Sequence, residues 1–190
     1  MGLYNIVVVG GIASGKTAFC RYAVRHYGGL TFSSDELFGR KEERAQITKV
    51  FANVIAERGP GYITDRMIEA YDERVAKGYD GPRILYHGGL RHMAGLRHIR
   101  EHPRFLGHHL VWLKVDDGTR YEHYRYADFY RGDRNLSFEG FMELNESSFE
   151  QELPLLREEA HSVIENVGTL ADFNDAIDDV MEKLGVPRLD

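Results

Sequence analysis

Short apolar runs alternate with amphipathic segments along the whole chain. The apolar runs cover residues 3–9, 30–32, 83–86, 109–115 and 161–165, and the first is rich in β-branched residues and ends at a Gly-Gly pair. Such runs are typical of buried strands in a parallel sheet. Between them, apolar residues at helical spacing predict helices over residues 15–26, 35–57, 62–77, 93–101, 138–158 and 170–184.

This alternation predicts the fold class. Strands that alternate with helices form a parallel sheet covered on both faces, because the right-handed crossovers run over the faces. We therefore expect an α/β protein with three layers and a mostly parallel, five-stranded sheet. The chain of 190 residues shows no linker, repeat or low-complexity tract, so we expect residues 1–190 to form one domain.

Composition narrows the class of partner. The net charge is −6, with a sequence pI of about 5.9, which argues against a surface built wholly for nucleic acid. A local basic groove stays open. The single cysteine, Cys20, cannot form an internal disulfide and lies in an apolar pattern, so we expect a buried core residue. The first apolar run is too short for a signal peptide or a membrane span, and we expect a cytoplasmic protein without a membrane partner.

Residues 10–17, Gly-Gly-Ile-Ala-Ser-Gly-Lys-Thr, match the phosphate-loop pattern G-x-x-x-x-G-K-[ST] in full. An apolar strand precedes the loop and a helix follows it, which is the context that the motif requires. Lys16 is expected to reach the β- and γ-phosphates of ATP, and the Thr17 hydroxyl to ligate Mg²⁺. The predicted ATP-binding residues of this segment are Gly11, Ile12, Ala13, Ser14, Gly15, Lys16, Thr17 and Ala18.

Other motifs separate the classes of nucleotide-binding protein. A guanine-reading Asn-Lys-x-Asp is absent, which argues against a GTPase, and the third strand ends at His87 where mechanical ATPases carry Asp. Four arginines instead follow the fourth strand, in a segment rich in aromatic residues: Arg120, Arg125, Arg131 and Arg134. Phosphoryl transfer between anionic substrates needs cations and the exclusion of water. We therefore predict a helical, arginine-bearing lid over about residues 117–136.

The sequence resembles the nucleoside-monophosphate-kinase-like group of P-loop kinases. It is most similar to dephospho-CoA-kinase-like and deoxynucleotide-kinase-like proteins, including phage and archaeal members. The resemblance rests on the phosphate loop, Ser-Ser-Asp at 33–35, His-Gly-Gly-Leu-Arg at 87–91, the lid arginines and Ile-Glu-Asn-Val-Gly-Thr-Leu at 164–170. It implies that Asp35 faces the phosphoryl acceptor and that Asn166 and Gly168 lie beside the adenine. His87 stands where many relatives have Asp.

The motifs and the resemblance together assign provisional roles. The candidate catalytic residues are Lys16, Asp35, Arg131 and Arg134; Arg120 and Arg125 are assigned to ATP, and Asp35, Arg66, His87 and Arg91 to the acceptor. Each has a plainer alternative. Asp35 is a general base, an orienting group or the N-cap of a helix. The arginines contact phosphate or form solvated salt bridges.

Three functions stay open at this point. The first is an ATP-dependent kinase that acts on a nucleotide-like acceptor, such as a deoxynucleoside monophosphate or dephospho-CoA. The second is a kinase for hydroxymethylated pyrimidines in DNA, in which the aromatic and basic segment stacks on bases. The third is an ATP-binding regulatory protein that transfers no phosphate. His98 and His102, four residues apart, offer a zinc pair, but Mg²⁺ with ATP is the metal we expect.

Overall fold

A five-stranded sheet forms the centre of the molecule. The computed structural model describes residues 2–33, 36–37, 53–126, 136–146 and 150–189. The strands lie in the order β2-β3-β1-β4-β5 and every pairing is parallel, which confirms the predicted α/β class. Their bounds are Leu3–Val9 for β1, Leu30–Thr31 for β2, Ile84–Gly88 for β3, Phe105–Lys114 for β4 and Ser162–Glu165 for β5.

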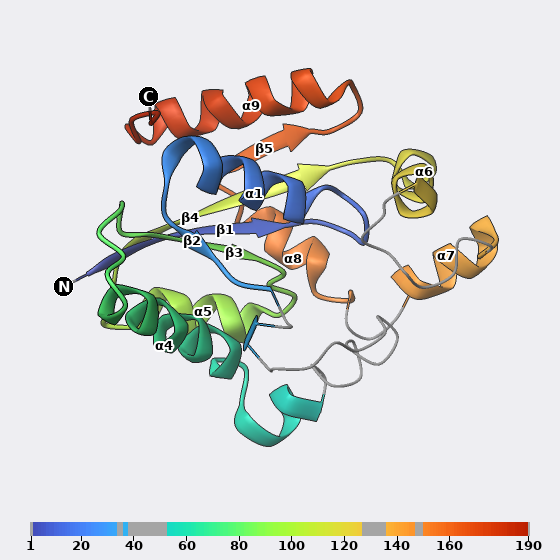
Figure 1. The fold of residues 1–190 in the computed structure, drawn as a ribbon. Coiled ribbons are helices and arrows are strands. Elements are labelled where there is room, and N and C mark those ends of the chain that lie inside the picture. Colours follow the sequence, from blue (N-terminus) through green and yellow to red (C-terminus); the bar gives the residue numbers. More distant parts are fainter. Residues whose placement is uncertain (1, 34–35, 38–52, 127–135, 147–149, 190) are drawn as a thin grey trace.

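Helices cover both faces of this sheet (Figure 1). On one face lie α1 (Lys16–Tyr27) and α9 (Leu170–Lys183), and on the other lie α4 (Tyr62–Ala76), α5 (Met93–Glu101) and α8 (Leu153–Glu158). Alternate residues of β1 face the two layers: Ile6 and Val8 pack with α1 and α9, while Val7 and Val9 pack with α5 and α8. The apolar run of β1 is continuous because the strand is buried on both faces.

Two further helices lie beyond the carboxyl ends of the strands. They are α6 (Asp117–Tyr126), which follows β4, and α7 (Phe138–Asn145). Their aromatic residues Tyr124 and Phe141 pack on Ala13 of the loop that joins β1 to α1. The first part of the predicted lid is therefore helical and lies against the phosphate loop, whereas residues 127–135 are outside the described part of the chain.

The hydrophobic pattern predicted the bounds of most helices and strands to within a few residues, but it was wrong about the start of β4 and about the helix expected over residues 138–158. β4 begins at Phe105, earlier than the expected residue 109. Gly107 and His108 interrupt the apolar pattern after Phe105 and Leu106, yet this part of the strand still pairs with β1. The single helix expected over 138–158 is wrong, because α7 ends at Asn145 and α8 begins at Leu153. The Asn145 side chain donates to the Phe141 carbonyl, and Pro154 favours a new helix start. Of the expected helix 35–57, most residues lie outside the described ranges.

The burial of Cys20 confirms its predicted place in the core. It packs between α1 and the sheet, and this burial raises the pKa of its thiol to about 12. Among the described residues, no helix is both long and apolar enough to cross a bilayer.

The start of α9 offers a direct test of the local sequence signal. The Thr169 hydroxyl accepts from the Asp172 amide, and the Asp172 carboxylate accepts from the Thr169 amide, which completes a capping box. Thr169→Ala should lower the free energy of unfolding by about 1 kcal/mol, measured by urea denaturation. Thr169→Ser keeps the hydroxyl and should stay near the wild type. Equal stability of the alanine variant would show that the box contributes nothing.

Candidate functional site

The loop between β1 and α1 adopts a backbone that sharply turns on itself. Gly10 and Gly15 have φ angles of 154° and 101°, and Ala13 is left-handed at 60°. Few residues other than glycine adopt positive φ, and such turns place successive amide groups on one concave side. Since α1 begins directly afterwards at Lys16, its amino-terminal dipole adds to the same side. The loop is therefore shaped for an anion.

The carbonyls of the loop point to side-chain donors. We call the carbonyl groups of residues 10–14 the loop carbonyls. The Lys16 ammonium donates to the carbonyls of Gly10 and Gly11 at 2.7 and 2.6 Å. The Arg91 guanidinium, which follows β3, donates to the Gly10 carbonyl at 2.8 Å.

Side chains from the segments that follow β4 and β5 are the partners of the remaining loop carbonyls. Arg120 of α6 donates to Ile12 at 3.1 Å, and the His123 Nδ1 lies 3.3 Å from the carbonyl of Ala13. The Asn166 amide, which follows β5, donates to the Ser14 carbonyl at 3.0 Å. All five loop carbonyls thus have a side-chain partner, so the backbone is held in the orientation that turns its amides inward.

Arg91 is more than a donor to the loop, because it also forms a buried ion pair. Its guanidinium lies 3.0 Å from the Glu150 carboxylate, and the two residues are only 9% and 8% exposed. A buried charge needs a partner, and here each charge supplies it for the other. The pair therefore ties the loop after β3 to the segment before α8, directly beside Gly10.

Arg120 occupies a similar position on the opposite side of the loop. It is 8% exposed, donates to the Asn145 side chain at 2.7 Å, and pairs with Asp117. Its guanidinium carbon also lies 5.6 Å from the centre of the Phe141 ring. A Cβ at Gly11 would collide with this guanidinium, so a glycine at this variable position of the motif lets Arg120 of α6 approach the loop.

His87, the last residue but one of β3, has a buried side chain. It is 6% exposed, its Nδ1 has no hydrogen-bond partner among the described residues, and burial lowers the pKa of its imidazole to about 4. The ring is therefore neutral at pH 7 and supplies no negative charge near the loop.

The other predicted site residues are distributed more widely. Thr17 and Ala18 are exposed on the first turn of α1, and Gly168 is exposed before α9. Arg125 is an exposed side chain that stacks near the Tyr121 and Tyr126 rings and pairs with Glu122. Arg66 pairs with Glu69 on its own helix, α4. Asp35, Arg131 and Arg134 lie outside the described residues.

The structure thus brings Lys16, Arg91, Arg120 and Asn166 together around one loop. It also adds three residues that the sequence did not single out for this site: His123, Asn145 and Glu150. A weak signal for Glu150 was available, since a buried arginine requires a carboxylate or an equivalent acceptor. Nothing in the spacing of the sequence says which of the many glutamates provides it.

Comparisons with other proteins support the fold assignment. No protein-family model matches the sequence, and none of the curated proteins compared is significantly similar to it. Solved structures do match: shikimate kinase from Bacteroides thetaiotaomicron has a TM-score of 0.57 at 15% identity, covering 96% of this chain and 98% of that one. Deoxyadenosine kinase from M. mycoides with bound dATP has a TM-score of 0.52 at 14% identity, covering 95% and 99%. Dephospho-CoA kinase from Campylobacter jejuni has a TM-score of 0.50 at 14% identity, covering 97% and 98%. The chain therefore has the fold of P-loop kinases, and the expected resemblance is confirmed at that level.

The buried ion pair predicts a large and specific loss of stability. Arg91→Met leaves the Glu150 carboxylate buried without its partner and should lower the free energy of unfolding by about 3–5 kcal/mol. Adding Glu150→Gln should recover part of this loss. Arg100→Met breaks the half-exposed pair with Glu159 and should cost less than about 1 kcal/mol. Chemical denaturation of the four proteins tests this, and similar losses in the two single variants would contradict it.

The neutral His87 predicts a pH dependence of stability. The unfolded imidazole titrates near pH 6.5 and the folded one near 4, so the unfolded state binds more protons between these values. This contribution to stability is present above pH 6.5 and is lost as the pH falls toward 4, to an extent of about 3 kcal/mol. His87→Gln should reduce the fall by that amount, whereas its difference from the wild type stays constant above pH 7. Parallel stability curves from pH 4 to 8 would show that His87 is not buried in this way.

Proposed function

We propose that this protein is an ATP-dependent kinase that transfers the γ-phosphoryl group of ATP to a small, nucleotide-like acceptor. The observation that supports it is the loop of residues 10–15, in which each carbonyl of residues 10–14 has a side-chain partner and after which the helix α1 starts at Lys16. This arrangement matches the needs of a polyphosphate, which requires inward amides and a lysine. The shared fold with P-loop kinases agrees with the proposal.

The residues fit Mg·ATP, which when bound supplies the phosphoryl group. Lys16, whose ammonium donates to the carbonyls of Gly10 and Gly11 in this structure, is assigned to the β- and γ-phosphates. The exposed Thr17 hydroxyl on the first turn of α1 is in position to serve as the Mg²⁺ ligand. Asn166, bonded to the Ser14 carbonyl, links the loop to the segment that we assign to the adenine side.

Arg91 and Arg120 take different roles in this proposal from those that the sequence suggested. Because both are buried and bonded to loop carbonyls, we assign them to holding the loop in its anion-binding shape. The cations that stabilise the transferred phosphoryl group are then Lys16 and the lid arginines Arg131 and Arg134. Asp35 is assigned to the acceptor hydroxyl, whose proton it accepts or orients as the bond to phosphorus forms and the bond to ADP breaks.

The acceptor class is the open part of the proposal. The matching structures include kinases named for shikimate, deoxyadenosine and dephospho-CoA, which are chemically diverse hydroxyl compounds. A panel of deoxynucleosides, their monophosphates, dephospho-CoA, hydroxy acids and hydroxymethylated DNA should be screened for acceptor-dependent ADP release. We expect turnover with a nucleoside-containing member. Turnover with the DNA alone would favour the base-modifying kinase instead.

The lysine variant tests the mechanism directly. Lys16→Met removes the charge that faces the phosphates and should lower kcat by about 10²- to 10³-fold without unfolding the protein. Lys114→Met, which breaks only an exposed pair with Glu165, should retain normal activity. Unchanged activity of Lys16→Met would overturn the mechanism. ATP binding without ADP release on any acceptor would favour a regulatory protein.

A further inference from the structure

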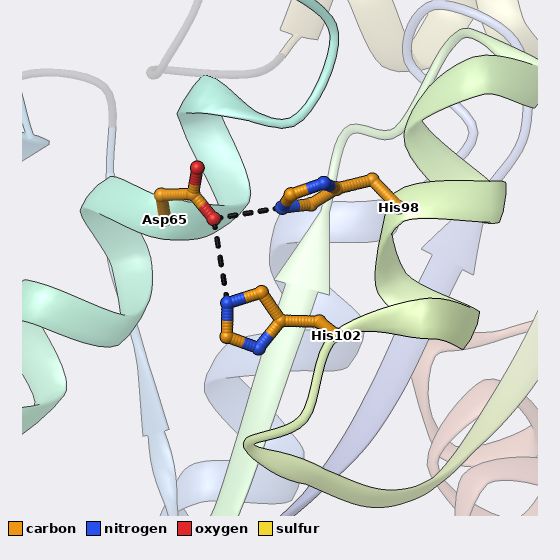
Figure 2. A group of neighbouring side chains, drawn as sticks. All are labelled: Asp65, His98 and His102. Carbon is orange, nitrogen blue, oxygen red and sulfur yellow. Dashed lines mark hydrogen bonds and ion pairs between the residues drawn. The ribbon is translucent and has the colours of Figure 1, made fainter.

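Two histidines face the carboxylate of Asp65 on α4, far in sequence from the phosphate loop: His98 lies on α5, and His102 directly follows the end of this helix. The Asp65 Oδ1 lies 2.7 Å from the His98 Nε2 and 3.5 Å from the His102 Nε2 (Figure 2). The two imidazoles stand 5.3 Å apart, centre to centre, as expected of residues four apart on a helix. Both rings therefore direct the same nitrogen at one oxygen atom.

We propose that Asp65, His98 and His102 form a binding site for a first-row transition-metal ion, with Zn²⁺ as the best-suited member. One ligand atom from each residue lies within 4.8 Å of the other two. Tetrahedral zinc with bonds of about 2.0–2.1 Å holds its ligand atoms about 3.3 Å apart. The two separations from Asp65 Oδ1 already lie within about 0.6 Å of that value.

The donor set selects among ions. Two imidazoles and one carboxylate suit zinc, nickel, copper and iron, whereas Mg²⁺ and Ca²⁺ prefer oxygen ligands. All three residues are only partly buried, so water can fill the remaining coordination positions. The metal would join α4 to α5 and is expected to stabilise this layer of helices. The proposal does not depend on the proposed kinase activity.

An imidazole ligates a metal ion through a ring nitrogen that carries no proton. If Nε2 carries the proton, this proton must move to Nδ1 by exchange with solvent before Nε2 can bind the ion. At His102 this shift displaces a hydrogen bond from the Arg104 amide to Nδ1, at 3.2 Å. No such bond restrains the His98 Nδ1 among the described residues. We therefore expect His98 to be the stronger of the two imidazole ligands.

The absence of a side chain at Gly61, which precedes α4, leaves space for the His98 ring. A Cβ added to Gly61 would lie 2.5 Å from the His98 Nδ1, so any side chain there must displace the ring. Gly61 has an ordinary helical φ of −82°, which alanine adopts without strain. Gly61→Ala is therefore a way to move the proposed ligand without removing it.

Titration of the full-length, chelator-treated protein with Zn²⁺ in the absence of nucleotide tests the site. Calorimetry should show one ion per chain, the absorption of Co²⁺ should indicate nitrogen and oxygen ligation, and Mg²⁺ should not bind. Zn²⁺ should also raise the Tm, because it binds only the folded state. His98→Gln, His102→Gln, Asp65→Asn and Gly61→Ala should each weaken binding by more than about tenfold, since even outer partners of a metal contribute about 10–100-fold.

Two matched controls separate this site from others. His108 belongs to a second group of histidines, in which its ring centre lies 5.3 Å from that of His161. His108→Gln should therefore leave the Zn²⁺ affinity unchanged. Lys16→Met should also bind Zn²⁺ normally, which separates the result from that of the kinase test. Loss of binding in the His108 variant but not in the His98 and His102 variants would overturn the proposal, as would no binding by the wild type. If a variant fails to fold, NMR of the wild-type imidazoles decides, because Zn²⁺ must shift the His98 and His102 signals.

Discussion

The loop after β1 turns sharply, and each of the five carbonyls of residues 10–14 has a side-chain partner. A buried carbonyl without a donor costs about 1–3 kcal/mol, so five adjacent carbonyls place a strong demand on their surroundings. The sheet order answers this demand. Because β1 lies between β3 and β4, the segments after these strands meet at the loop, and Arg91, Arg120 and His123 come from there, while Asn166 follows β5. The strand order of the sheet therefore determines which side chains reach the loop carbonyls.

Two buried arginines beside the loop each pair with a carboxylate. Arg91 is neutralised by Glu150, and Arg120 by Asp117, so two buried cations hold the loop without adding an unpaired charge to the interior. Lys16 adds a third cation to the same loop, since its ammonium donates to the carbonyls of Gly10 and Gly11 and lies 3.4 Å from the Ser14 hydroxyl.

The two faces of the sheet have different characters. On the side of α1 and α9, an almost wholly apolar cluster supports the loop from behind. On the side of α4, α5 and α8, polar groups are inserted: the neutral His87, the paired Arg91, and the cluster of Asp65, His98 and His102. A neutral imidazole at the end of β3 also means that this strand contributes no anion beside the loop. Any Mg²⁺ bound with a nucleotide would depend on Thr17, the phosphates and residues of other segments.

Local pattern by itself determined the strand over 3–9, the helix over 93–101, the capping box at Thr169 and the phosphate loop, because each depends on residues near one another in sequence. Only the tertiary structure decided the partners of the long polar side chains. Arg91 and Arg120 looked like ligand contacts from their positions after strands, yet the fold places them on loop carbonyls, with Glu150 and Asn145 brought from about 59 and 25 residues away. The start of β4 and the break between α7 and α8 were likewise set by pairing and packing. Asp65 joins His98 and His102 for the same reason: hydrophobic burial fixes how helices pack, and the polar groups that then meet leave no periodic trace in the sequence.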